Sequence, residues 1–119
     1  MSILVVEDDQ PLREAFESVF REHGYKVTTA KNGEEALHSI RQERPSFIFI
    51  DLVMPVMSGF RLIEALKLDS TLADIPMVAM TAASATAPVP VPVVRKPFAT
   101  ETALELVRPH CNQSRSPRP

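Results

Sequence analysis

The sequence contains few of the residues on which several common kinds of protein site depend. Its 119 residues include one cysteine, Cys111, which excludes an internal disulfide and a metal cage built from cysteines. Only three glycines are present, and no glycine-rich segment ends in the Gly-Lys-Ser/Thr of a P-loop, so a P-loop nucleotide enzyme is excluded. Charge of one sign forms no block and the net charge is -2, which argues against direct binding of nucleic acid.

Long apolar runs are also missing. No apolar segment is long enough to span a membrane. The apolar start SILVV is followed at once by the acids Glu7, Asp8 and Asp9, which is not the pattern of a secretory signal. Hydrophobic residues nevertheless make up 45% of the chain and charged residues 24%, which suits one globular domain with one core. We therefore expect a cytoplasmic domain without a membrane contact.

Short apolar runs alternate with segments of helical periodicity along the chain. Strands are expected at SILVV, YKVTTA, SFIFID, PMVAM and VVRK. Helices are expected to begin near Pro11, Asn32 and Ser58, and a short final helix is expected over residues 102–108, where Pro109 ends it. This alternation predicts an α/β fold with a doubly wound parallel sheet of five strands and helices on both faces.

Polar side chains stand where the expected strands end. The first strand is followed by Glu7 and Asp8, the third ends in Asp51, the fourth in Thr81 and the fifth in Lys96. In open α/β sheets, functional groups collect outside the carboxyl ends of the strands. Because adjacent strands lie ~5 Å apart, these side chains are expected to converge on one crevice.

Such a cluster of acids repels itself, since two like charges about 4 Å apart cost roughly 4 kcal/mol at an effective dielectric of 20. A hard divalent cation relieves this repulsion, and a few oxygen ligands favour Mg²⁺ over zinc. Asp51 could then act as a nucleophile and form an aspartyl phosphate. Thr81 and Lys96 would donate hydrogen bonds to the phosphoryl oxygens.

Four motifs, ILVVEDD, IDLVMPVMSG, MTA and KPF, occur in the order found in response-regulator receiver domains of two-component signalling. The chain resembles this family from Ile3 to Val107. The resemblance implies the flavodoxin-like strand order 2-1-3-4-5 and a receiver domain over residues 1–108. Residues 109–119 show no periodicity, so we expect a disordered tail or the start of a linker there. The resemblance implies a phosphoacceptor domain, not an enzyme beyond self-catalysed phosphotransfer and dephosphorylation. A sensor histidine kinase or phosphotransfer protein would supply the phosphoryl group, and output would pass through a downstream protein or self-association.

The resemblance also implies a role for individual residues. Asp51 corresponds to the phosphoacceptor. The Mg²⁺ ligands correspond to Asp51, Asp8, Glu7 acting through water, and the backbone carbonyl of Val53.

The remaining positions of the match concern the phosphoryl group. Thr81 corresponds to the switch hydroxyl, Ala82 to a backbone contact, and Lys96 to the lysine that pairs with the phosphoryl oxygens. The Lys96-Pro97 bond corresponds to one that is usually cis in this family, and cis bonds are almost confined to X-Pro.

One departure from the family lies between the switch threonine and the lysine, where receivers carry a whole fourth helix. The segment here reads AASATAPVPVPVVR, and Pro88, Pro90 and Pro92 each remove a backbone donor. We expect the fourth helix to be shortened or missing and replaced by an extended proline-rich segment. That segment should run over the surface or along a sheet edge, with its valines on the exposed apolar patch.

A second departure is Val93, which occupies the position of the switch aromatic three residues before the lysine. Valine cannot make the inward swing of that aromatic, so the readout of phosphorylation must differ. An alternative function is therefore a receiver-like protein-binding module that works without phosphorylation. An aspartate-nucleophile phosphatase is disfavoured, because Val53 stands at the second acid position of its D-x-D motif.

Overall fold

The computed structural model describes residues 2–82, 89–96 and 100–111. Five parallel strands form one sheet in the order β2-β1-β3-β4-β5. The strands are β1 (Ser2–Val6), β2 (Lys26–Ala30), β3 (Phe47–Asp51), β4 (Met77–Thr81) and β5 (Val93–Arg95). The expected α/β fold with its flavodoxin-like strand order is therefore confirmed.

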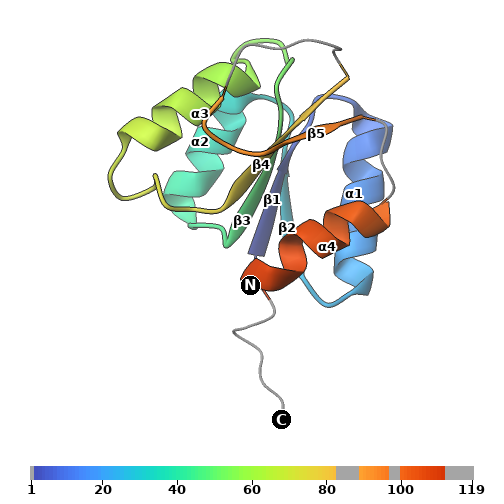
Figure 1. The fold of residues 1–119 in the computed structure, drawn as a ribbon. Helices are drawn as coiled ribbons and strands as arrows, with labels where there is room; N and C mark the ends of the chain where they lie inside the picture. Colours follow the sequence, from blue (N-terminus) through green and yellow to red (C-terminus); the bar gives the residue numbers. More distant parts are fainter. Residues whose placement is uncertain (1, 83–88, 97–99, 112–119) are drawn as a thin grey trace.

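Helices cover both faces of the sheet (Figure 1). One face carries α1 (Gln10–Glu22) and α4 (Thr100–Cys111), and the other carries α2 (Gly33–Gln42) and α3 (Gly59–Leu68). Every residue of the three central strands β1, β3 and β4 is buried, which explains why their sequences are almost wholly apolar. No helix within the described ranges has both the length and the apolarity needed to cross a membrane.

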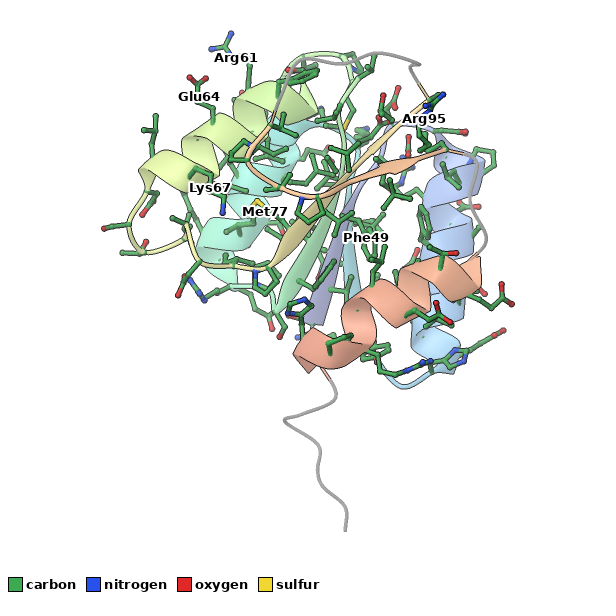
Figure 2. The ribbon with its side chains drawn as sticks, in the orientation of Figure 1. Phe49, Arg61, Glu64, Lys67, Met77 and Arg95 are labelled. Carbon is green, nitrogen blue, oxygen red and sulfur yellow. The ribbon has the colours of Figure 1, made fainter. Side chains whose placement is uncertain are left out.

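Each face has its own apolar cluster. Under α1, Phe49 of β3 stacks against Phe16 and Phe20, with ring centroids 5.9 and 5.6 Å apart. Figure 2 shows Phe49 in this layer, between the sheet and the helices α1 and α4. The opposite cluster contains Leu62 and Ile63 of α3. The two clusters hold the strand ends, and the acids that follow them, in a fixed arrangement.

The final helix is longer than the sequence predicts. α4 begins at Thr100 and continues through Pro109 to Cys111, so the expectation that Pro109 ends it is wrong. A proline gives up its own backbone hydrogen bond, but its φ is helical, and the loss is small in a last turn. The ring of His110 lies 5.2 Å from the ring of Phe47, so packing against β3 supports this turn. The predicted tail over residues 112–119 lies outside the described residues.

The proline-rich segment leads into the edge strand β5. The predicted loss of a helix between β4 and β5 falls partly on residues 83–88, which lie outside the described ranges; residues 89–92 contain no helix. The carbonyl of Pro92 accepts a hydrogen bond of 2.9 Å from the amide of Ala79, so the segment joins the edge of β4. Val89 and Val91 pack against the apolar cluster on the α2 and α3 face, as the alternation of valine and proline predicts.

Candidate functional site

Three acids meet at the carboxyl end of the sheet. In Figure 2 this end can be found by the label of Arg95, the last residue of β5. Glu7 and Asp8 directly follow β1, and Asp51 ends the neighbouring strand β3. One carboxylate oxygen of each lies within 4.8 Å of the other two. Glu7 and Asp51 are buried, whereas Asp8 is exposed. The structure thus brings together the acids that the strand ends predict.

Lys96 joins this cluster from the edge of the sheet. Its ammonium lies 2.9 Å from Oε1 of Glu7 and 3.2 Å from Oδ2 of Asp51. Its backbone amide donates a hydrogen bond of 2.8 Å to the carbonyl of Thr81, which fixes the residue against β4. The side chain is only 16% exposed, so the lysine lies in the crevice and is not an ordinary surface lysine.

Burial and neighbouring charge change the acidity of these groups. Burial, with Asp51 adding to it, raises the pKa of Glu7 from 4.5 to about 7, while Lys96 acts in the opposite direction. Burial lowers the pKa of Lys96, but its bonds to Glu7 and Asp51 outweigh this and raise that pKa overall. The lysine is therefore charged at neutral pH, and the site holds one ammonium among three acids.

The backbone around Asp51 is held by the loop that follows it. The amide of Val53 donates a hydrogen bond of 3.1 Å to Oδ1 of Asp51. Gly59 begins α3 directly against this backbone, and its amide donates a hydrogen bond of 3.1 Å to the carbonyl of Leu52. A β-carbon on Gly59 would collide with the carbonyl oxygen of Asp51 and with Cα of Leu52. Only glycine fits at this position, so the start of α3 sets the position of Asp51.

The residues predicted to contact a phosphoryl group lie around the same crevice. Thr81 is buried at the end of β4, one residue beyond Met80, which pairs with Asp51. Ala82 follows it and is exposed. The predicted cis bond between Lys96 and Pro97 lies outside the described residues.

Val53 and Val93 are the two valines to which the sequence assigns a position in the site, as the carbonyl ligand and at the place of the switch aromatic. The side chain of Val53, two residues after Asp51, is 65% exposed. Val93 is 42% exposed on the edge strand β5.

Asp9 occupies the position before α1, but its side chain makes no capping hydrogen bond.

One further residue, Arg13 on α1, contacts the loop that carries the acids and was not predicted from the sequence. Its guanidinium Nη1 donates a hydrogen bond of 2.9 Å to the carbonyl of Glu7. The signal was weak: Arg13 stands four residues after Asp9, so it faces back over the start of α1 toward the loop with the acids. The partner of Arg13 is a backbone carbonyl, which every residue has, so no paired acid in the sequence indicates this contact.

The donor set fits a hard divalent cation. It consists of three carboxylates that approach one another closely, and carboxylate oxygens are the ligands that Mg²⁺ and Ca²⁺ prefer. Two of these acids are buried with a single ammonium between them, so their mutual repulsion is only partly balanced. The chain's own residues therefore suit a cation such as Mg²⁺.

Comparison with known proteins gives consistent results for sequence and fold. A family model described as the response regulator receiver domain matches residues 3–108. The probable transcriptional regulator ycf27 of Porphyra purpurea is 40% identical over 80 residues, which are 67% of this chain and 32% of the relative. This chain thus spans about a third of that relative's length.

Two solved structures share the fold. The chemotaxis protein CheY4 of Vibrio cholerae superposes with a TM-score of 0.81 at 29% identity, over 92% of this chain and 97% of that one. The receiver domain of the sensor histidine kinase PA1611 of Pseudomonas aeruginosa PAO1 gives 0.82 at 24% identity, over 92% and 95%. Its structure is described with a magnesium ion coordinated in the active-site cleft.

Proposed function

The chain belongs to the response regulator receiver domain family, and we propose that it accepts a phosphoryl group on Asp51 and signals through protein contacts. The observation that carries this proposal is the position of Asp51, beside two further acids and 3.2 Å from the ammonium of Lys96. Burying a charge is costly, and two further acids beside Asp51 add repulsion, so this arrangement lowers stability and points to a functional role.

Mg²⁺ is the cofactor we propose for this site. Glu7, Asp8 and Asp51 would hold it, with the backbone carbonyl of Val53 as a further ligand. When bound, such a cation offsets the negative charge of the acids and of the incoming phosphoryl oxygens.

The reaction we propose is a transfer between two covalent carriers. A carboxylate oxygen of Asp51 forms a bond to phosphorus, and the bond from phosphorus to the donor's imidazole nitrogen breaks, with its electron pair leaving on that nitrogen. Lys96 is charged at neutral pH and can donate to a phosphoryl oxygen, as can the hydroxyl of Thr81. The donor would be a sensor histidine kinase or a phosphotransfer protein in the cytoplasm, and the chain itself is a phosphoacceptor, not an enzyme acting on other substrates.

Incubation with acetyl phosphate and Mg²⁺, followed by intact mass spectrometry, tests this proposal. The wild-type chain should gain the mass of one phosphoryl group, and Asp51→Asn should gain none. Asp69→Asn is a matched control, since Asp69 is a half-buried aspartate at the C-terminal end of α3, outside the group of three acids, and it should be modified like the wild type.

A second candidate function is a protein-binding module that works without phosphorylation. Val93 at the switch position favours it, because an exposed valine on an edge strand offers no aromatic to move inward. An unmodified mass for the folded wild-type chain in the experiment above would support this second function.

A further inference from the structure

The loop between β1 and α1 carries two of the three acids and is held by an arginine. Arg13 lies in the first turn of α1 and is half-buried. Its Nη1 lies 2.9 Å from the carbonyl oxygen of Glu7 and 3.5 Å from that of Asp8. The backbone amide of Arg13 also donates a hydrogen bond of 2.9 Å to the carbonyl of Asp9, which fixes the backbone of the arginine itself to the same loop.

The two carbonyls that face Arg13 belong to the peptide groups on either side of the Asp8 α-carbon. Each peptide group is planar, so the orientations of these two planes fix φ and ψ at Asp8. The direction of the Asp8 Cα–Cβ bond follows from those two angles, and the side chain can vary only by rotation about its own bonds. A guanidinium that binds both carbonyls therefore restricts where the Asp8 carboxylate points.

Asp8 needs such support more than the other two acids do. The carboxylate of Glu7 is held by Lys96 at 2.9 Å and by the amide of Asp9 at 3.1 Å. Asp51 is held by Lys96 and by the amide of Val53. The carboxylate of Asp8 is exposed, and within the described ranges no hydrogen bond or ion pair to the protein fixes it.

Arg13 supports the loop without neutralising the acids. Among the residues that the structure describes, it forms no ion pair with a carboxylate, because its hydrogen bonds go to backbone carbonyls. The carboxylate oxygens of Asp8 thus stay available to a cation, although a positive charge lies close by.

We propose that Arg13 is a positioning residue for the divalent-cation site, acting through the backbone on the direction of Asp8. This inference rests on the proposed function, in which Asp8 is a ligand of Mg²⁺. Residues that orient metal ligands commonly contribute tenfold or more to metal affinity.

Whether replacement of Arg13 weakens or strengthens Mg²⁺ binding distinguishes a positioning role from an effect of its charge alone. A guanidinium near a cation site repels the cation, so removal of its charge alone would strengthen Mg²⁺ binding. Loss of positioning has the opposite effect and weakens Mg²⁺ binding, because Asp8 then samples directions away from the site.

Calorimetric titration of the full chain with MgCl₂ measures this difference directly. Arg13→Met keeps an apolar stem of similar length and should raise the Kd for Mg²⁺ about tenfold. Arg13→Lys keeps one donor group and should recover part of the affinity. Arg21→Met is the control: Arg21 lies on the same helix, and its guanidinium also donates to a carbonyl, that of Val27, at 3.2 Å. It should bind Mg²⁺ like the wild type.

Thermal melting without Mg²⁺ shows whether Arg13 merely stabilises the fold. A structural role alone would lower the Tm of Arg13→Met and leave its Kd at the wild-type value. Arg13→Gln, which is neutral and shorter, carries the same test should Arg13→Met not fold.

The outcomes distinguish this inference from the proposed function. A Kd for the folded Arg13→Met or Arg13→Gln variant that equals or falls below the wild-type Kd overturns the role of Arg13 and leaves the metal site standing. A wild-type chain that shows no Mg²⁺ binding overturns both.

Discussion

The ammonium of Lys96 lies 3.2 Å from Oδ2 of Asp51, although 45 positions separate the two residues in the sequence. The contact depends on the edge strand β5, which has only three residues and is preceded by the proline-rich segment. The backbone of this strand is fixed to β4 at both ends, by Pro92 bound to Ala79 and by Lys96 bound to Thr81. A short strand held at both ends is therefore sufficient to deliver the lysine to the acids.

Replacement of Lys96 by methionine should slow phosphorylation of Asp51 by about tenfold or more, because a donor to the phosphoryl oxygens is lost. The initial rate of mass gain with acetyl phosphate and Mg²⁺ measures this. Lys67→Met is the control, since the Lys67 ammonium donates to the carbonyl of Ala73 at 3.0 Å, away from the acids. Equal rates for the two variants would argue against the role of Lys96.

Glu7 should make the chain less stable as the pH rises toward neutrality. Its pKa is about 7 in the folded chain, against 4.5 as the ordinary value. Between these pH values the folded chain keeps a proton that the unfolded chain has lost. The stabilising contribution is therefore complete below pH 4.5 and disappears as the pH rises through about 7.

Urea unfolding of Glu7→Gln and wild type, without Mg²⁺ and at a series of pH values, tests this sign. The variant should gain roughly 3 kcal/mol in free energy of unfolding relative to wild type between acidic and neutral pH. The exposed Glu14→Gln serves as the control and should follow the wild-type curve. Parallel curves for Glu7→Gln and wild type would contradict the raised pKa of Glu7.

Gly59→Ala should destabilise the fold and disturb Asp51 at the same time. The added β-carbon meets backbone atoms of Asp51 and Leu52, which cannot move aside cheaply. We expect a loss of about 2 kcal/mol or more in free energy of unfolding, together with slower phosphorylation.

Gly24→Ala is the informative comparison for Gly59. Gly24 has φ of +88°, but a β-carbon there meets no atom within 4 Å. Its replacement should cost about 1 to 2 kcal/mol from backbone strain and leave phosphorylation unchanged. A Gly59→Ala chain that is phosphorylated at the wild-type rate would show that α3 does not set the position of Asp51.

Val56→Asn should stabilise the chain. Val56 has φ of +67° and is 76% exposed in the loop between Asp51 and α3. A β-branched residue is strained in this left-handed conformation, which asparagine tolerates better. The expected gain is about 1 kcal/mol in free energy of unfolding. Val56→Thr keeps the branching and should give no such gain; an equal gain from both variants would mean that polarity, not strain, is responsible.

Much of the fold follows from local sequence. Strands buried on both faces need continuous apolar runs, and FIFI before Asp51 is such a run. The start of α2 was predictable because asparagine is a favoured residue at the position before a helix, and the Asn32 side chain accepts a hydrogen bond of 2.8 Å from the amide of Glu35. The grouping of the acids was also predictable, because each follows or ends a buried strand and the carboxyl ends of parallel strands lie at one edge of the sheet.

Other features depend on tertiary contacts that leave no local pattern. Pro109 signalled a helix end, but packing of His110 against Phe47 supports another turn of α4. The bonds of Arg13 to the loop carbonyls were not predictable, because every residue has a carbonyl and the choice among them is made by the fold.

The central claim is that Asp51 itself receives the phosphoryl group, and chemical mapping of the modified residue tests it most directly. Borohydride reduces an aspartyl phosphate to homoserine, which tandem mass spectrometry of the digested chain can locate. The proposed function predicts homoserine at position 51 only, and only when acetyl phosphate and Mg²⁺ are both present during the incubation. Homoserine at another acid, or at none, would contradict it.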